Sequence, residues 1–206
     1  MPLNVRAKSN NHKLVSNQRE RIAKAALSLY MKRGFRNTGV HDVAKASRMS
    51  VGNLYNYIGS REDILLLVLE LGLRVQTGLQ EIVRSTEHLK PGEALPLFIR
   101  SAYQLIDRNQ DFISFFFFET KHLAPKARKS AADVELLAMT HIEELLKKGH
   151  ENGEFEFIAN VRAFSHNLFV IIEMWAVRQW LYKDMISLED QIQMHTECVM
   201  KCVKKT

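Results

Sequence analysis

Val51, Gly52 and Asn53 are consecutive residues whose side chains suit the recognition of a surface with mixed chemistry. In the first turn of a helix, Val51 could contact a thymine methyl group, and Gly52 would let the backbone approach closely. The carboxamide of Asn53 could exchange hydrogen bonds with the edge of a base. These residue types in this order favour a helix whose first turn enters a groove of DNA.

Two short helical patterns joined by a tight turn would position these three residues. The first pattern starts at Thr38, and its Val40, Val43 and Ala44 are spaced to face a small core. Ser50 can cap the second helix, in residues 51–58, where Leu54 and Ile58 lie four residues apart and so share one buried face. The opposite face of this second helix is then free for DNA.

Longer helices are expected on either side of this pair. Asn17, with Glu20 three residues later, has the pattern of a capping box that opens the preceding helix. Gly34 would end that helix, because glycine adopts the left-handed conformation at low cost. Ser60 with Asp63 would cap the long helix that follows. The pattern predicts a helix-turn-helix between two longer helices.

A resemblance to a known family rests on the stretch VAKASRMSVGNLYNYIGSREDIL, which is similar to the DNA-binding domain of the tetracycline-repressor (TetR-type) family of bacterial regulators. The domain that the resemblance covers, residues 16–60, is roughly a quarter of the chain, and the match is specific for a short motif. The resemblance implies base contacts from Val51, Gly52 and Asn53, and it places His41 where a side chain often touches bases or phosphate. It also implies phosphate contacts from four further residues, namely Thr38, Tyr55, Tyr57 and Arg61.

Two departures from the family pattern affect the turn and the buried face. Arg48 stands where the family usually has glycine, and a residue other than glycine in the left-handed region costs about 1 kcal/mol or more. The turn is therefore expected to differ slightly from the usual one. Ile58 replaces the usual phenylalanine, which changes packing on the buried face and casts little doubt on the DNA contacts.

Basic residues are concentrated at the N-terminal end. Residues 1–61 contain 12 Lys and Arg against 2 Asp and Glu, whereas residues 62–206 contain 17 against 21. A basic head on an acidic body favours a phosphate-binding domain joined to a domain with another role. The expected organisation is a flexible basic arm at 1–15, a helix-turn-helix domain at 16–60, and a ligand-binding and dimerisation domain at 61–206.

The composition favours an all-α protein. Hydrophobic residues make up 46% of the chain, which contains only 9 Gly and 4 Pro, so long periodic segments can bury a substantial core. Besides the three helices of the head, six more are expected, near residues 61–87, 92–109, 111–120, 125–151, 160–182 and 187–203. No apolar run has the length of a membrane span and no secretory signal is present, which indicates a cytoplasmic protein.

A cluster of phenylalanines lies within residues 112–118. Consecutive helical residues turn by about 100 degrees, so these rings cannot share one side, and their helix should be buried nearly all round. They could simply fill a core, or some could line an apolar pocket for a small hydrophobic effector such as an acyl chain or an aromatic molecule. The candidate pocket residues, with polar members that would orient the effector, are Tyr103, Leu105, Phe112, Phe115, Phe116, Phe118, His141, Asn167, Phe169, Ile172, Glu173 and Trp175.

The last two expected helices each carry an apolar stripe. Two such stripes in antiparallel helices suit a four-helix seam in a symmetric homodimer, and the alternative is packing within the chain. Paired heads that read a palindromic site require two-fold symmetry, which favours the dimer. The candidate seam residues are Phe164, Leu168, Ile171, Trp175, Leu188, Ile192, His195, Val199 and Cys202.

Other kinds of chemistry have weaker support. His195, Cys198 and Cys202 could offer three metal ligands along one helix face, but a structural zinc site wants four and no obvious fourth stands nearby. The sequence also lacks a phosphate-cradling glycine loop, a nucleophile elbow and the zinc-peptidase motif H-E-x-x-H. We therefore predict a protein that is not an enzyme and needs no metal or cofactor.

Together these observations predict a transcriptional regulator that binds an inverted repeat in double-stranded DNA as a homodimer. The resemblance implies a repressor that a small hydrophobic effector releases from its operator. The alternative is a DNA-bound adaptor whose body binds another protein. Gly72 and Gly78, in the helix after the head, are candidate points of bending or of close packing if that helix transmits the effector signal.

Overall fold

The computed structural model describes residues 12–119, 125–156 and 158–204. Across these ranges the chain forms ten helices and no strand, which confirms the all-α prediction. An isolated bridge joins Phe155 to Lys204. Of the helices described, none is both long and apolar enough to cross a bilayer.

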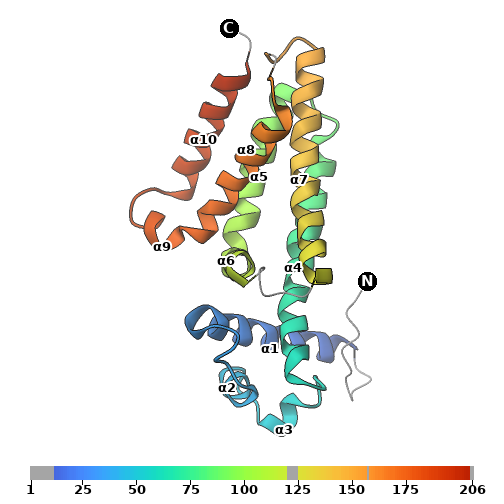
Figure 1. Cartoon of the computed structure of the whole chain (residues 1–206), viewed down its shortest axis with the longest axis vertical. Helices are drawn as coiled ribbons and strands as arrows, with labels where there is room; N and C mark the ends of the chain where they lie inside the picture. Colours follow the sequence, from blue (N-terminus) through green and yellow to red (C-terminus); the bar gives the residue numbers. More distant parts are fainter. Residues whose placement is uncertain (1–11, 120–124, 157, 205–206) are drawn as a thin grey trace. The chain divides into compact units, whose positions relative to one another are not determined.

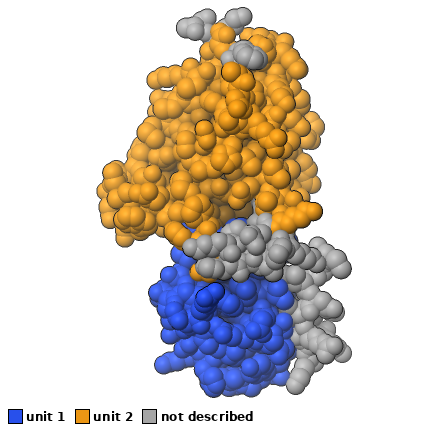
Figure 2. Space-filling view, viewed as in Figure 1, with its two compact units in different colours: residues 1–74, 114–116 blue, residues 75–113, 117–206 orange. Residues whose placement is uncertain are grey.

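The chain divides into two compact units, coloured separately in Figure 2. The N-terminal unit comprises residues 1–74 with 114–116, and the C-terminal unit comprises residues 75–113 with 117–206. The boundary falls inside the long helix α4 (Arg61–Thr86), 14 residues beyond the position expected from the sequence. Each unit therefore includes part of α4.

The N-terminal unit contains α1 (His12–Arg33), α2 (Val40–Ala46), α3 (Val51–Leu54) and the start of α4. Helix α1 packs against α2, and α2 packs against α3 (Figure 1). Their shared core consists of apolar side chains that are almost completely buried, including Ile22, Ala26, Val43, Leu54, Ile58, Ile64 and Leu67. Burial of Leu54 and Ile58 confirms the apolar face that their four-residue spacing predicts.

Several predicted helix boundaries are confirmed by their hydrogen bonds. The backbone N–H of Asn53 donates to Ser50 Oγ at 3.1 Å. The N–H of Asp63 donates to Ser60 Oγ at 3.3 Å, while the N–H of Ser60 donates to Asp63 Oδ2 at 3.2 Å. Gly34, with φ of +81°, follows the end of α1 as predicted. All these interactions lie within a few residues, which is why the sequence reveals them.

The predicted capping box at Asn17 is wrong, because α1 already begins at His12. Val15 is only 7% exposed, so burial of an apolar side chain one turn earlier extends the helix. Glu20 pairs instead with Arg74 and Lys24. These partners, Arg74 first, lower the pKa of Glu20 to about 2. Part of the expected flexible arm is thus helical, and its first 11 residues lie outside the described ranges.

Helix α5 (Pro91–Arg108) is the central helix of the C-terminal unit. It packs against α7 (Pro125–Glu151), α8 (Val161–Val177) and α10 (Leu188–Val203), and α7 also packs against α8 (Figure 1). Its buried face follows helical spacing through Leu95, Phe98, Ile99, Ala102, Tyr103 and Ile106.

Gly78 allows close packing between α4 and α5. A Cβ atom at this position would lie 2.6 Å from Leu105 Cδ1. Of the two roles considered for Gly78, this contact favours close packing over bending.

Two helical predictions in the C-terminal unit need correction. The segment expected at 160–182 breaks at Arg178 into α8 and a short α9 (Gln179–Tyr182), which accounts for the tenth helix. Trp175 stacks with Tyr182 at a ring distance of 6.0 Å across this break. Helix α6 (Gln110–Glu119) is not buried all round, because Phe117 and Phe118 are 53% and 56% exposed.

Buried polar side chains tie α5 to α10. The hydroxyl of Tyr103 lies 2.8 Å from His195 Nδ1, and Gln191 Nε2 donates to the same hydroxyl at 3.0 Å. At the surface, Arg100 forms a bidentate ion pair with Glu189. Burial lowers the pKa of His195 from 6.5 to about 4, so the folded protein holds this imidazole neutral.

This depressed pKa predicts an acid-sensitive stability. Between pH 6.5 and 4 the unfolded chain binds a proton at His195 that the folded chain does not. The stabilisation is complete above pH 6.5 and should fall by about 2 kcal/mol at pH 5. Urea unfolding followed by circular dichroism at pH 7.5 and 5.0 measures this loss. His195→Gln should show a clearly smaller loss, and an equal loss in both proteins would contradict the prediction.

Candidate nucleic-acid interface

The turn between α2 and α3 is held by short-range hydrogen bonds. The N–H of Met49 donates to the carbonyl of Ala44 at 2.8 Å, and the N–H of Arg48 donates to that of Lys45 at 3.1 Å. Ser47 Oγ donates to the carbonyl of Val43 at 2.7 Å. Arg48 has φ of +53°, the left-handed conformation that its place in the turn predicts, at a cost of about 1 kcal/mol.

The residues predicted to read bases lie on the accessible side of α3 and α2. Gly52, Asn53 and His41 are exposed, and Val51 is half-buried. Leu54 is 0% exposed, so the opposite side of α3 faces the core. The helix is shorter than the expected 51–58, because it ends at Leu54 and continues as turns. A single exposed helical turn thus presents a methyl group, a bare backbone and a carboxamide.

The four residues predicted to contact phosphate fall into two groups. Tyr55 is 43% exposed and Tyr57 is half-buried. Thr38 is 2% exposed, and its hydroxyl donates to the carbonyl of Gly34 at 3.0 Å. Arg61 is also used inside the unit, as described below. The tyrosines are thus accessible to a ligand, whereas the side chain of Thr38 is buried in the protein.

Arg61 anchors the start of α4 to the loop between α1 and α2. Its Nη2 donates to the carbonyls of Phe35 and Arg36 at 3.0 and 3.1 Å. Its guanidinium also lies over the Phe35 ring, 5.1 Å from the centroid. A lysine ammonium can also donate two hydrogen bonds from one nitrogen, but it cannot place a planar guanidinium over the Phe35 ring.

Three exposed cations of the N-terminal unit do not figure among the DNA contacts predicted from the sequence: Arg36, Lys45 and Arg48. Their positive charge is visible in the sequence, but the sequence does not reveal which cations form ion pairs or hydrogen bonds within the fold. Arg33, for example, pairs with Asp42 at 3.0 Å. Asp42 in turn accepts from the N–H of Gly39, and this bond first, then Arg33, lowers the pKa of Asp42.

One turn of α6, residues 114–116, belongs to the N-terminal unit. Within this unit Phe115 stacks on Tyr30 at a ring distance of 5.6 Å, and Tyr30 also meets Phe35 edge to face at 5.2 Å. Phe115 was predicted to line an effector pocket. It is instead part of the core that supports α1.

The twelve predicted pocket residues differ widely in their burial. Eight of the twelve are buried in packed surroundings, namely Tyr103, Leu105, Phe112, Phe115, His141, Phe169, Ile172 and Trp175. Phe116 and Glu173 are half-buried, while Phe118 and Asn167 are exposed.

Several polar groups among the predicted pocket residues have partners inside the protein. His141 Nε2 lies 2.8 Å from Thr86 Oγ1, and Trp175 Nε1 donates to Asp107 at 2.8 Å. Burial, and then the nearby Glu135, raises the pKa of Glu173 to about 8, so this carboxyl carries a proton at neutral pH.

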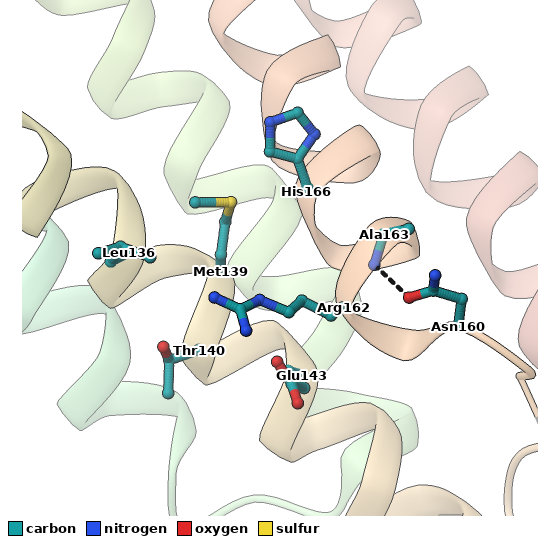
Figure 3. Close-up of a pocket in the computed structure, with 8 residues that line it drawn as sticks. All are labelled: Leu136, Met139, Thr140, Glu143, Asn160, Arg162, Ala163 and His166. Carbon is teal, nitrogen blue, oxygen red and sulfur yellow. Dashed lines mark hydrogen bonds between the residues drawn. The ribbon is translucent and has the colours of Figure 1, made fainter.

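An open groove of about 640 Å³ lies between α7 and the start of α8 (Figure 3). Its apolar wall includes Leu136, Met139 and Ala163, and Arg162 and His166 line it from α8. Asn160 Oδ1 accepts from the N–H of Ala163 and so caps α8 at the groove. None of the twelve predicted pocket residues lines this groove. His166, whose place in an apolar helical pattern makes it a possible polar contact for an effector, does line the groove.

Five of the nine residues predicted to form the dimer seam are buried within the protein's own C-terminal unit. Leu168, Trp175, Ile192, His195 and Val199 are buried in the C-terminal unit. The half-buried members are Phe164 and Leu188, and the exposed ones are Ile171 and Cys202. The metal alternative finds no support in the described ranges, where no three potential ligands gather. His195 is buried against Tyr103, whereas Cys198 and Cys202 are exposed.

Comparison with known proteins gives consistent matches. Residues 22–68 match the model described as bacterial regulatory proteins, tetR family. The chain is 28% identical over 182 residues to the HTH-type transcriptional regulator HbdR of Aromatoleum sp. strain CIB. The aligned segment covers 88% of this chain and 78% of HbdR. It is 30% identical over 114 residues to the HTH-type transcriptional repressor KstR2 of Rhodococcus jostii, covering 55% of each protein.

A solved structure shares the fold at low sequence identity. The crystal structure of AibR in complex with isovaleryl coenzyme A and operator DNA superposes with a TM-score of 0.72 at 16% identity. The superposition covers 88% of this chain and 97% of AibR. HbdR and KstR2 are transcriptional regulators rather than enzymes, and AibR has been crystallised on operator DNA.

The anchoring of α4 by Arg61 predicts a stability effect. Arg61→Lys keeps the charge but loses the planar guanidinium over Phe35, so the free energy of unfolding should fall by about 1 kcal/mol. Thermal unfolding followed by circular dichroism measures this change. Arg36→Lys, a matched change at an exposed cation, should have little effect. Unchanged stability combined with weaker DNA binding would instead support the phosphate contact that the family resemblance implies.

Proposed function

We propose, from the premise that this chain belongs to the TetR family of DNA-binding transcriptional regulators, that it is a ligand-responsive repressor of an inverted-repeat operator. The observation that carries this proposal is the exposed first turn of α3, with Gly52 and Asn53 accessible and Leu54 buried behind them. The net charge of the head supports it, because cations that neutralise phosphates supply much of the affinity for DNA.

The proposed base readers are Val51, Gly52, Asn53 and His41. Asn53 is suited to an adenine, since a carboxamide can bond both N6 and N7 of that base in the major groove. Tyr55 and Tyr57 are the proposed phosphate contacts, because a hydroxyl can donate to a phosphate oxygen. Thr38 lies two residues before α2, and we propose that its buried hydroxyl holds the loop before α2 in place rather than contacting a phosphate.

We propose a homodimer that uses the outer faces of α8 and α10. The inward stripes already pack in the chain, but Ile171 and Met194 are 46% and 48% exposed on these helices. Cys198 and Cys202 are also exposed on α10. A two-fold dimer would place its two reading helices about 34 Å apart, one turn of DNA or a multiple of it, and would match an inverted repeat.

We propose that the effector is a small hydrophobic molecule with a polar or anionic end. The groove between α7 and α8 offers an apolar wall at Leu136 and Met139, with the guanidinium of Arg162 beside it. AibR, which shares the fold, has been crystallised with isovaleryl coenzyme A, a short acyl chain on an anionic carrier. Leu136 is 44% exposed, so the alternative of a protein partner on this groove is retained.

The effector signal could pass along continuous helices. Both α4 and α6 contribute residues to the two units. An effector that favours a DNA-incompetent state by about 3 kcal/mol would weaken operator affinity about 150-fold once that state dominates. The close contact of Gly78 with Leu105 gives α4 a rigid support for such a shift.

Selection from a random duplex library tests the function as a whole. Recovery of one inverted repeat by the purified full-length protein would support the proposed dimeric repressor and provide a probe for effectors. Binding that is salt-sensitive but independent of sequence would contradict it, because phosphate contacts alone give that behaviour.

Two substitutions on α3 should have different effects on operator binding. Asn53→Ala should relax the preference at one base pair in each half-site, by about 1–3 kcal/mol of discrimination. Tyr55→Phe should weaken binding to all sequences about equally, because it removes a phosphate contact. Competition binding with single-position operator variants measures both effects. An equal loss on all sequences for Asn53→Ala would refute its role as a base reader.

Filling the groove should block the response to the effector. We expect a coenzyme A thioester with a short acyl chain to release the operator from the wild-type protein. Ala163→Trp should raise the concentration needed for half-release by about tenfold or more and leave operator affinity unchanged. Leu97→Trp, at an exposed position on α5, is the matched control. Release of Ala163→Trp at the wild-type concentration would place the effector outside this groove.

A further inference from the structure

Arg48 is in a strained conformation that nothing within the fold requires of an arginine. Among the described residues other than glycine, it alone has a positive φ, at +53°. The hydrogen bonds from the N–H groups of Arg48 and Met49 to the last turn of α2 fix this conformation. These bonds involve the backbone alone, so glycine would make them without strain.

The side chain of Arg48 has no compensating role inside the protein. It is exposed, and in the part of the chain that the structure describes its guanidinium has no hydrogen bond, ion pair or ring contact. Arg61, by contrast, donates to two backbone carbonyls and lies over Phe35. Packing therefore does not explain why an arginine occupies the turn.

The position of Arg48 offers an explanation outside the protein. It stands two residues before Ser50, the cap of α3, and three before Val51. A helix that enters the major groove by its first turn brings the preceding turn near the phosphates that border the groove. Lys45, one turn earlier at the end of α2, is exposed as well and adds positive charge beside Arg48.

We propose that Arg48 contacts a DNA phosphate at the edge of each half-site. Its guanidinium carries a permanent charge and a planar set of donors that match phosphate oxygens. Glycine at the same turn can make no such contact. This inference rests on the proposed operator binding through α3. It explains the arginine at this strained position by a contribution of its side chain to DNA affinity rather than to folding.

Arg48→Gly separates a role in DNA binding from a role in folding. It should raise the stability of the fold and lower the affinity for the operator. Removing the strain should raise the midpoint of thermal unfolding by about 2–4 °C. Removing the phosphate contact should weaken operator binding on the order of tenfold in about 0.1 M salt, and the slope of log K against log salt should become shallower by about 2 for a dimer. Arg48→Lys should keep most of that slope. Arg84→Gln, which removes one cation from the C-terminal unit, is the control for net charge.

The possible results distinguish this inference from the proposed function. If the wild-type protein recognises no inverted repeat, the proposed function fails. If it does so and Arg48→Gly binds with unchanged affinity and salt slope, only the role of Arg48 is overturned. A lower unfolding midpoint for Arg48→Gly would overturn the assignment of strain. A loss confined to operators that carry one particular base pair would overturn the phosphate contact in favour of base reading.

Discussion

Burial of Leu54 determines what the N-terminal unit can present to DNA. Helix α3 is a single turn, so one fully buried side chain fixes its rotation. With Leu54 in the core, Gly52 and Asn53 must face outward. Hydrogen bonds in the turn at Arg48 and from Arg61 Nη2 to the loop after α1 hold the two ends of the segment in place. The orientation of Gly52 and Asn53 toward DNA thus depends on the burial of Leu54 behind them.

The sequence predicts those features that depend on neighbours a few residues away. Ser50, the Ser60–Asp63 pair and Gly34 all act within one turn of their own helix, and each was identified correctly. The start of α1 was missed because it depends on burial of Val15 by the tertiary fold. The break at Arg178 was missed for the same kind of reason, since no glycine or proline stands there. Apolar periodicity on α8 and α10 indicates a buried face, but it does not distinguish a partner subunit from α5.

The C-terminal unit uses most of its interior polar groups to join its own helices. Tyr103 and His195 bond to each other, as do Trp175 and Asp107, which leaves those side chains committed to the fold. Arg162, by contrast, is exposed at the α7–α8 groove, where we propose that the effector binds. Glu173 is a different case, because its protonated carboxyl can act as a hydrogen-bond donor at neutral pH.

The stack of Phe115 on Tyr30 limits how far the head of this protein is a separable module. The turn of α6 that supplies Phe115 is distant in sequence but belongs to the N-terminal unit. A fragment that ends at residue 74 would leave one face of Tyr30 without its aromatic neighbour. Chimaeras that exchange heads between regulators of this kind would need to carry residues 114–116 with the head. Evolution by shuffling of the first 74 residues alone would meet the same obstacle.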